Sequence, residues 1–165
     1  MMPYSVGPAP ALGSPVVVDV VTTVVVVMLL ALRWWRAAVV VTLARVSELV
    51  CESVVKVLVA RPRPVLVDPV ASASGSGFPS GHAGGSAAVY GALVLVVLAG
   101  GTRCARVMLV TGAALLIGAV AVSRVLLGVH YPSDVAAGVA LGLAWVSGAA
   151  LLVSLPRSAL SPTSV

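Results

Sequence analysis

Five long apolar runs divide the chain of 165 residues, and they constrain its fold more than any other feature. They cover residues 16–32, 37–60, 83–99, 107–127 and 135–153. Each is close to the ~20 apolar residues that a helix needs to cross the hydrocarbon core of a bilayer. Several runs are rich in valine, but none alternates apolar with polar residues as a half-buried strand would. Because lipid offers the backbone no hydrogen bonds, we expect each run to form a transmembrane helix.

The composition supports a membrane protein. Hydrophobic residues make up 60% of the chain and charged residues 9%, and the mean hydropathy is +1.15. An ordinary soluble domain has about 25% charged residues, and a disordered chain has low hydrophobicity. The net charge of +5 does not indicate nucleic-acid binding, because the cations are scattered and aromatic residues, at 4%, offer few stacking surfaces. The prediction is a single all-α domain over residues 1–165, a polytopic bundle of about five membrane helices.

The positions of the cations predict how the chain is oriented in the membrane. With five spans, the connection after the first run, the connection after the third and the tail 154–165 lie on one face. These segments carry Arg33, Arg36, Arg103, Arg106 and Arg157. The positive-inside rule makes that face cytoplasmic, and the membrane is expected to be the plasma membrane. The N-terminal segment 1–15 and the connections 61–80 and 123–133 are then expected on the outer face.

Most of the remaining polar residues fall in these two outward connections or at the helix ends beside them. Lys56, Arg63 and Arg124 provide three cations, and arginine presents a planar fork suited to phosphate oxygens. Ser80 and Gly81 stand where the third helix is expected to begin, and the N–H groups of a helix N-terminus attract anions. Ser80 is also a good helix N-cap, which is the structural alternative. Together these residues predict a site for an anion of phosphate size.

Two histidines and one carboxylate accompany the cations. His82 and His130 are the only histidines of the chain, and Asp134 follows His130 by four residues. A carboxylate there can accept a hydrogen bond from one ring nitrogen and leave the other nitrogen free to attack, as in a catalytic triad. His82 can then act as the general acid. The alternatives are histidines that serve only the membrane interface and an Asp134 that interacts only with the helix dipole.

The polar residues form three short motifs with fixed spacing. They are Lys56 with Arg63-Pro64, then Pro79-Ser80-Gly81-His82, then Ser123-Arg124 with His130 and Asp134. In order and spacing they resemble the Lys-x6-Arg-Pro, Pro-Ser-Gly-His and Ser-Arg-x5-His-x3-Asp motifs of the type 2 phosphatidic acid phosphatase family, which shares its site with vanadium haloperoxidases. The resemblance extends from about Glu48 to the end of the fifth run.

This resemblance implies a role for each motif residue. The residues that would bind the phosphoryl oxygens are Lys56, Arg63, Ser80, Gly81 and Arg124. His130 would be the nucleophile and form a phosphohistidine, and Asp134 would orient it. His82 would protonate the leaving oxygen and later activate water. No metal or other cofactor is implied, and the five acids of the chain include no paired outward cluster for Mg²⁺.

Two features depart from the family pattern, and one loop has an open role. Family members usually have six membrane helices, whereas five runs are present here, which leaves room for a homo-oligomer. Arg61-Pro62 is a second Arg-Pro pair with the wrong spacing from Lys56, so Arg61 is predicted to be an accessory residue. The loop 65–80, which contains Asp68, is either a mobile lid over the site or an inert connection.

The second run is unusual because it carries charged residues on one helical face. They are Arg45, Glu48, Glu52 and Lys56. A charge in the bilayer centre costs about 2.5–3.5 kcal/mol on insertion scales, so each is expected to be paired or functional. Pairs of Arg45 with Glu48 and of Glu52 with Lys56 are one interpretation, and a proton path or substrate contact is the other. Glu52 is predicted to be an accessory residue that positions Lys56. Asp19, in the first run, is expected to be solvated.

The predicted function is metal-independent hydrolysis of an outward-facing phosphomonoester or diphosphate of a membrane lipid in a bacterial cell. The leading interpretation is a polyprenyl-linked substrate of cell-wall synthesis, such as decaprenylphosphoryl-phosphoribose or undecaprenyl diphosphate. Phosphatidic acid or phosphatidylglycerophosphate is the alternative. A non-catalytic protein that binds lipid phosphates would keep the anion site without needing both histidines and Asp134. A haloperoxidase would share the site but is normally soluble.

Overall fold

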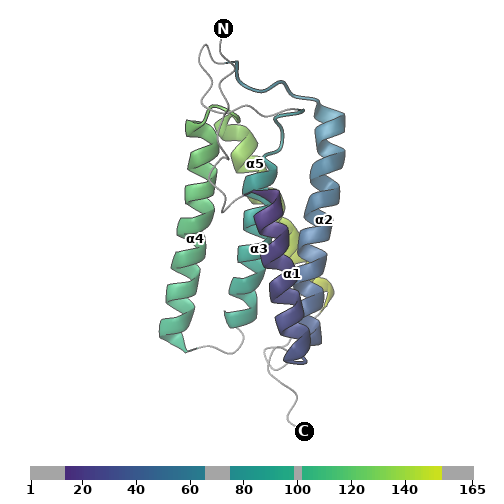
Figure 1. Ribbon diagram of the computed structural model, residues 1–165, viewed down its shortest axis with the longest axis vertical. Helices are drawn as coiled ribbons and strands as arrows, with labels where there is room; N and C mark the ends of the chain where they lie inside the picture. Colours follow the sequence, from purple (N-terminus) through teal and green to yellow (C-terminus); the bar gives the residue numbers. More distant parts are fainter. Residues whose placement is uncertain (1–13, 66–74, 99–101, 154–165) are drawn as a thin grey trace.

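The computed structural model describes residues 14–65, 75–98 and 102–153, and within them all regular structure is helical (Figure 1). The helices are α1 (Pro15–Ala31), α2 (Trp35–Val59), α3 (Gly81–Leu98), α4 (Arg103–Leu126) and α5 (Pro132–Leu152). Each lies on one of the apolar runs, so the predicted all-α bundle is confirmed. The expected cytoplasmic tail with Arg157, and Asp68 with the central part of the expected lid, lie outside the described residues.

Three of these helices, α3, α4 and α5, are long and apolar enough to cross a membrane. The prediction of five spans differs at α1 and α2 for two separate reasons. α1 is apolar but has only 17 residues, and α2 has 25 residues but carries the charges of the second run. Both pack within the bundle, since α2 contacts α1, α3 and α5. Length and composition alone do not mark α1 and α2 as spans, but their contacts place them in the same bundle as α3 and α5.

Consecutive helices run in opposite directions (Figure 1). The end of α2, the start of α3, the end of α4 and the start of α5 therefore lie at one end of the bundle, which we call the site end. The α1–α2 connection and the start of α4 lie at the other end. This arrangement agrees with the prediction that the connections 61–80 and 123–133 share one face.

Close packing of α5 against α3 sets the positions of the polar residues that both helices carry. Gly138 and Gly142 form a G-x-x-x-G pattern on α5 that faces α3. A Cβ at Gly138 would collide with the carbonyl oxygen of Ser80, and a Cβ at Gly142 with that of Gly84. Only glycine therefore allows this approach. Beside it, the Ser80 N–H donates to the Asp134 carbonyl oxygen at 3.0 Å.

The four charged residues from Arg45 to Lys56 lie on one face of α2 and are paired. Arg45 donates to Glu48 at 2.6 Å and to Asp19 of α1 at 2.8 Å, and Glu52 pairs with Lys56. The two predicted pairs are confirmed. The expectation that Asp19 is merely solvated is wrong, because its carboxylate, although half exposed, neutralises Arg45, which is buried. We call Asp19, Arg45 and Glu48 the buried ion cluster.

Glycines of α3 make room for the carboxylates of α2. A Cβ at Gly81 would overlap the carboxylate of Glu52, and a Cβ at Gly84 would overlap that of Glu48. Both carboxylates are more than nine-tenths buried. Charged groups in an apolar medium are stable only when other protein groups replace water around them. The glycine face of α3 therefore lets α2 carry charge inside the bundle.

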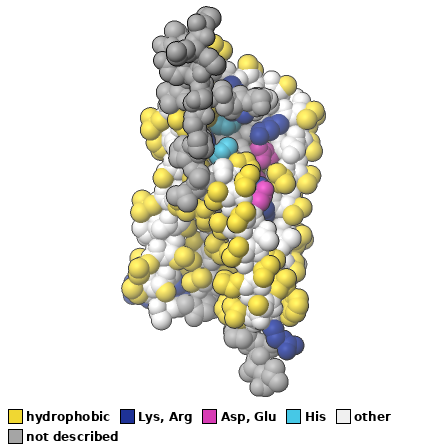
Figure 2. All heavy atoms as spheres, in the orientation of Figure 1, with side chains coloured by type: hydrophobic (Ala, Val, Ile, Leu, Met, Phe, Trp, Pro, Cys, Tyr) yellow, Lys and Arg dark blue, Asp and Glu magenta, His cyan; other side chains and the backbone are white. Residues whose placement is uncertain are grey.

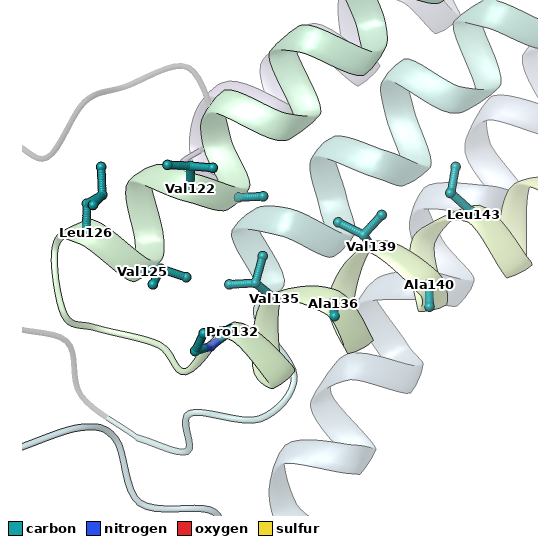
Figure 3. Close-up of a pocket in the computed structure, with 10 residues that line it drawn as sticks. Val122, Val125, Leu126, Pro132, Val135, Ala136, Val139, Ala140 and Leu143 are labelled. Carbon is teal, nitrogen blue, oxygen red and sulfur yellow. The ribbon is translucent and has the colours of Figure 1, made fainter.

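An apolar groove of about 640 Å³ lies between α4 and α5 (Figure 3). Leu126 and Pro132 line it near the site end, and Val139 and Leu143 line it farther along α5. It exists because α4 packs more closely against α3 than against α5. An apolar groove open at the surface suits a bilayer, whose hydrocarbon chains can fill it.

Candidate active site

The motif residues come together at the site end of the bundle. Lys56 is in the last turn of α2, His82 in the first turn of α3, Arg124 in the last turn of α4, His130 in the α4–α5 connection and Asp134 in the first turn of α5. Figure 2 shows the histidine side chains next to each other on this part of the surface, beside positively and negatively charged side chains. Because of the helix directions, polar groups from four separate parts of the sequence lie at one end of the bundle.

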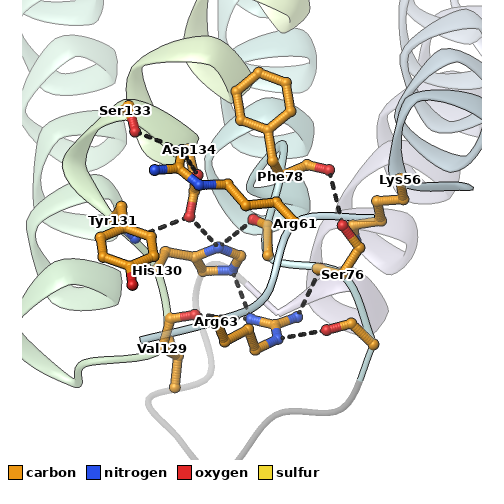
Figure 4. Close-up of polar contacts among 12 residues, drawn as sticks. Lys56, Arg61, Arg63, Ser76, Phe78, Val129, His130, Tyr131, Ser133 and Asp134 are labelled. Atoms are coloured by element: carbon orange, nitrogen blue, oxygen red, sulfur yellow. Dashed lines mark hydrogen bonds and ion pairs between the residues drawn. The ribbon is translucent and has the colours of Figure 1, made fainter. Parts of the chain in front are cut away.

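The imidazole of His130 is held on both of its nitrogens (Figure 4). Its Nδ1 lies 2.7 Å from the carbonyl oxygen of Gly77, and its Nε2 lies 3.2 Å from Nη1 of Arg63. A carbonyl can only accept and a guanidinium can only donate. These partners assign the proton to Nδ1 and leave a lone pair on Nε2. Nε2 is therefore the nitrogen that can attack an electrophile.

The surroundings of His130 keep its ring neutral. Burial lowers its pKa below the ordinary 6.5, and the positive charge of Arg63 lowers it further. The hydrogen bond to Gly77 and the charge of Asp134 act in the opposite direction but are weaker. A neutral imidazole keeps its lone pair at neutral pH. The site therefore maintains His130 in the form that a nucleophile needs.

Asp134 makes different contacts from those that the motif predicts. Its carboxylate is wholly buried, and Oδ2 lies 3.7 Å from Nδ1 of His130, beyond hydrogen-bond distance. Oδ2 accepts the Tyr131 N–H at 2.9 Å, and Oδ1 accepts Nη1 of Arg61 at 2.8 Å. The Gly77 carbonyl thus takes the hydrogen bond expected of Asp134. Asp134 stays close enough to stabilise charge on the ring, and it also caps the first turn of α5.

Arg63 stands directly in front of Nε2 of His130. Its Nη1 donates to the Val129 carbonyl at 2.9 Å, its Nε to Gly75 at 3.1 Å and its Nη2 to Ser76 at 3.3 Å. These carbonyls belong to both connections at the site end, so Arg63 joins them. Burial lowers the pKa of Arg63, but a guanidinium remains charged at physiological pH. An anion that reached Nε2 would meet this charge first.

The start of α3 supplies further polar groups. The Ser80 hydroxyl is wholly buried and has no hydrogen-bond partner among the described residues. It therefore does not cap the helix through its side chain, and its capacity to form hydrogen bonds remains unused among these residues. The Ser80 N–H, by contrast, is used by Asp134. The positive charges of Arg124, Lys56 and Arg63 act on His82, as does His130 when it is protonated, which places His82 in the same cluster.

The two remaining motif cations are held at the edges of the site. Lys56 pairs with Glu52 and keeps about a third of its side chain exposed. Arg124 is 4% exposed, and its Nε donates to the Ser123 hydroxyl at 3.2 Å. Glycine at position 81 is required for space, because the Glu52 carboxylate occupies the place of a side chain there. All three cations thus act on His82, and Arg63 and Lys56 also act on His130.

Some contacts at the site could not be predicted from the sequence. The Gly77 carbonyl is a backbone group, so no residue type could have announced its role. Arg61 was expected to be accessory because of its spacing, and the structure brings it to Asp134 and Ser133. The Arg61 guanidinium also lies over the Tyr131 ring, 4.6 Å from its centroid. Among the described residues, no group of three acidic, histidine or cysteine side chains could hold a metal ion.

Comparisons with known proteins agree with this fold and site. The sequence profile of the PAP2 superfamily matches residues 34–157. The glucose-6-phosphatase catalytic subunits 1 of Mus musculus and Rattus norvegicus are 40% identical over 85 residues, which is 46% of this chain and 24% of theirs, so the match spans about a quarter of these relatives. A transmembrane PAP2-type phosphatidylglycerolphosphate phosphatase from Bacillus subtilis has a similar structure, with a TM-score of 0.78 and 25% identity over 87% of this chain and 72% of that one. The chain is therefore a membrane protein that belongs to the PAP2 superfamily.

Proposed function

We propose that this protein is a membrane phosphatase that hydrolyses a phosphate ester of a lipid through a phosphohistidine on His130. The observation that supports this most directly is the geometry of the His130 ring. Nδ1 is held by a carbonyl at 2.7 Å, and Nε2 presents its lone pair beside Arg63 at 3.2 Å. A buried neutral imidazole that faces a cation is suited to attack an anionic phosphoryl group.

Substrate binding begins with the phosphate. Arg63 turns its guanidinium from Nε2 of His130 to the phosphoryl oxygens, and Lys56 and Arg124 approach from the two sides. The buried Ser80 hydroxyl donates to a third oxygen, which satisfies a group that has no partner among the described residues. Charges fixed in a site of low dielectric stabilise the five-coordinate phosphorus without a metal ion.

Chemistry then proceeds in two displacements. Nε2 of His130 forms a bond to phosphorus as the ester P–O bond breaks, and His82 gives its proton to the leaving oxygen. The ring gains positive charge, which the Gly77 carbonyl and the nearby Asp134 carboxylate stabilise. Water then attacks the phosphohistidine, His82 accepts the proton of that water, and the P–N bond breaks to release phosphate. Both steps reuse the same cations.

The substrate class follows from the relatives and from the membrane. The Bacillus subtilis neighbour is, by name, a phosphatase of phosphatidylglycerolphosphate, and it covers 87% of this chain. That similarity favours a glycerophospholipid phosphate over the polyprenyl phosphates that the sequence first suggested. Both substrates join a phosphate to an apolar tail, and the apolar surface of the helices suits either tail. The rodent relatives act, by name, on a soluble sugar phosphate, so the shared element is the phosphoryl site.

The site end faces the outside of the plasma membrane in this proposal. Arg33 and Arg36, and Arg103 and Arg106 at the start of α4, lie at the opposite end of the bundle. The positive-inside rule assigns that end to the cytoplasm. A cysteine at position 76, in a chain without Cys51 and Cys104, should react with an impermeant reagent in intact cells. Protection of this cysteine until the cells are opened would contradict the orientation.

The test of the proposed activity uses purified protein in detergent with phosphatidylglycerophosphate, phosphatidic acid, a polyprenyl diphosphate and glucose 6-phosphate. Phosphate release should be unaffected by EDTA, inhibited by vanadate and lowered at least about 10³-fold by His130→Ala. The substrate with the highest kcat/KM identifies which class of phosphate ester the protein prefers. A strict requirement for Mg²⁺, or full activity of His130→Ala, would contradict the mechanism. Binding of every lipid without release of phosphate would favour a non-catalytic lipid-binding protein.

A further inference from the structure

Within the described part of the chain, the Arg61 side chain contacts the first turn of α5 and the residue before it (Figure 4). Its Nη1 donates to Oδ1 of Asp134 and to the hydroxyl of Ser133, each at 2.8 Å. The guanidinium also stacks over the ring of Tyr131 at 4.6 Å. Two hydrogen bonds and a cation–π contact from one side chain hold it in a single orientation. The Arg61 side chain is thus held in place against the start of α5.

The backbone of Arg61 reaches the other acceptor near His130. The Arg61 carbonyl oxygen accepts the Gly77 N–H at 2.8 Å, and the Gly77 carbonyl in turn accepts from Nδ1 of His130 at 2.7 Å. Gly77 also lies against Asp134, since a Cβ there would be 3.4 Å from Oδ2. Arg61 therefore contacts both groups on the Nδ1 side of the ring, one through its side chain and one through its backbone.

The charge of Arg61 also solves an energetic problem at Asp134. This carboxylate is wholly buried, and a buried carboxylate without a cation is unstable. Oδ1 is directed at Arg61, so Oδ2 is left to face Tyr131 N–H and the imidazole of His130. The ion pair thus sets the rotation of the carboxylate as well as its charge balance.

We propose that Arg61 is a positioning residue that acts on His130 through Asp134 and Gly77 and does not bind the phosphate. The inference rests on the proposed function, because it assigns a role in the same reaction. Arg61 and Arg63 are separated by one proline, yet they serve opposite sides of one ring. Arg63 stands at Nε2, where phosphorus would bind, and Arg61 acts on the Nδ1 side, which Gly77 and Asp134 hold.

The kinetic test compares Arg61→Met with Arg63→Met and uses Arg36→Met, an exposed arginine at the other end of the bundle, as the matched control. Arg61→Met should lower kcat about 10-fold or more while KM and the vanadate inhibition constant stay within about 2-fold. Arg63→Met should weaken vanadate inhibition, and Arg36→Met should change neither. Arg61→Lys, which keeps the charge, should restore part of kcat. Loss of vanadate affinity in Arg61→Met as large as in Arg63→Met would overturn the proposal.

A double-mutant cycle separates positioning from general support of the fold. In an Asp134→Asn background, Arg61→Met should have little further effect on kcat, because the contact through which it acts has already been changed. If Arg61 only supported the fold, each change would lower kcat only to the extent that it lowers thermal stability, since residues in contact are coupled in stability as well. Additive effects of the two substitutions on kcat would contradict the inference.

A second measurement decides the matter without activity. The chain has only two histidines, so nitrogen-labelled histidine gives few ring signals, and His82→Gln identifies those of His130. Arg61→Met should shift the Nδ1 signal of His130, and Arg36→Met should not. An unchanged His130 signal would overturn the positioning role even if the wild-type protein releases no phosphate. Conversely, an inactive wild type with a shifted signal would defeat the proposed function and leave the contact established.

Discussion

The site end and the buried ion cluster are both groups of charges that are wholly or partly buried, but they are organised differently. In the ion cluster, Arg45 lies between Asp19 and Glu48, so unlike charges meet directly. At the site end, the positive charges of Lys56, Arg63 and Arg124 all act on His82, and Arg63 donates to carbonyl oxygens. Like charges repel, and repelled cations bind an anion that relieves the repulsion. This difference supports a structural role for the ion cluster and the anion-binding role that we propose for the site end.

Hydrogen-bond capacity shows a related contrast. At the site end, Arg63 is held by carbonyl oxygens of two connections, which a phosphate can replace at little cost in charge. The buried Ser80 hydroxyl, at the start of α3, has no partner among the described residues. In the ion cluster, Arg45 donates to two carboxylates, which no ligand can easily displace. The carboxylate partners of Arg45 thus suit a structural role, whereas the neutral carbonyl partners of Arg63 suit a role in binding an anion.

The largest expected difference separates Arg63→Met from Arg45→Met. Loss of Arg63 removes a charge that acts on the transition state, so kcat/KM should fall about 10²–10³-fold with little change in stability. Loss of Arg45 leaves Asp19 and Glu48 without a cation and should lower the free energy of unfolding by about 3–5 kcal/mol. Phosphate release and thermal unfolding in detergent, on the same preparations, measure both. An Arg45→Met protein of wild-type stability that is inactive would break the contrast.

The packing of α5 against α3 offers a smaller difference. In Gly138→Ala the new Cβ would meet the Ser80 carbonyl, so stability should fall by about 1–3 kcal/mol, and activity should fall because Ser80 and Asp134 shift. Gly148, on the same helix, has nothing within 4 Å of an added Cβ. Gly148→Ala should therefore be neutral or stabilise by up to about 1 kcal/mol. Equal effects of both substitutions on the unfolding temperature would contradict the packing described here.

The pH dependence sharpens the description of the site end. His130 must be neutral to attack, and burial together with Arg63 lowers its pKa below 6.5. Activity should therefore persist below pH 6.5 and decline only as the pH falls through the lowered pKa. Because Arg63 contributes to the lowering, the acidic limb of the residual kcat/KM of Arg63→Met should move upward. An acidic limb that stays in place in this variant would show that Arg63 does not act on the ring.

The smallest expected effect is that of Asp19→Asn. The Asp19 carboxylate is 53% exposed, and Arg45 keeps Glu48 as a partner, so stability should change by about 1 kcal/mol or less. Phosphate release should be unchanged. Thermal unfolding and activity in detergent test both expectations. If Asp19→Asn lost activity but kept wild-type stability, the ion cluster would be needed for catalysis, and the distinction between it and the site end would be wrong.

Much of the fold could be predicted because lipid allows few alternatives. Runs of about 20 apolar residues must be helical in a bilayer, and the five runs locate the helices closely. Alternating helix directions then bring the three motifs to one end. The pairing of Asp19 with Arg45 was not predictable, since it depends on how α1 crosses α2 and joins residues 26 apart in the sequence.

The candidate site was predictable where it uses side chains at fixed spacing and not where it uses the backbone. Lys56, Arg63, His82 and His130 meet as their motifs indicated. The Gly77 carbonyl takes the hydrogen bond that was expected of Asp134, because the turn before α3 brings a backbone oxygen closer to Nδ1 than the carboxylate. No periodicity or motif encodes the direction of a carbonyl in a connection. The contact of Arg61 with Asp134 could not be predicted either, because it depends on the path of the connection after α2.

The central claim is that Nε2 of His130 bonds to phosphorus, and trapping that bond tests it most directly. The protein is mixed with a radiolabelled lipid phosphate, quenched rapidly in alkali and digested into peptides. The label should be found on the peptide that contains His130, should be lost in mild acid as a P–N bond requires, and should be absent from His130→Ala. Release of phosphate by the wild type with no label on the protein, or with an acid-stable label on Ser80, would contradict the account.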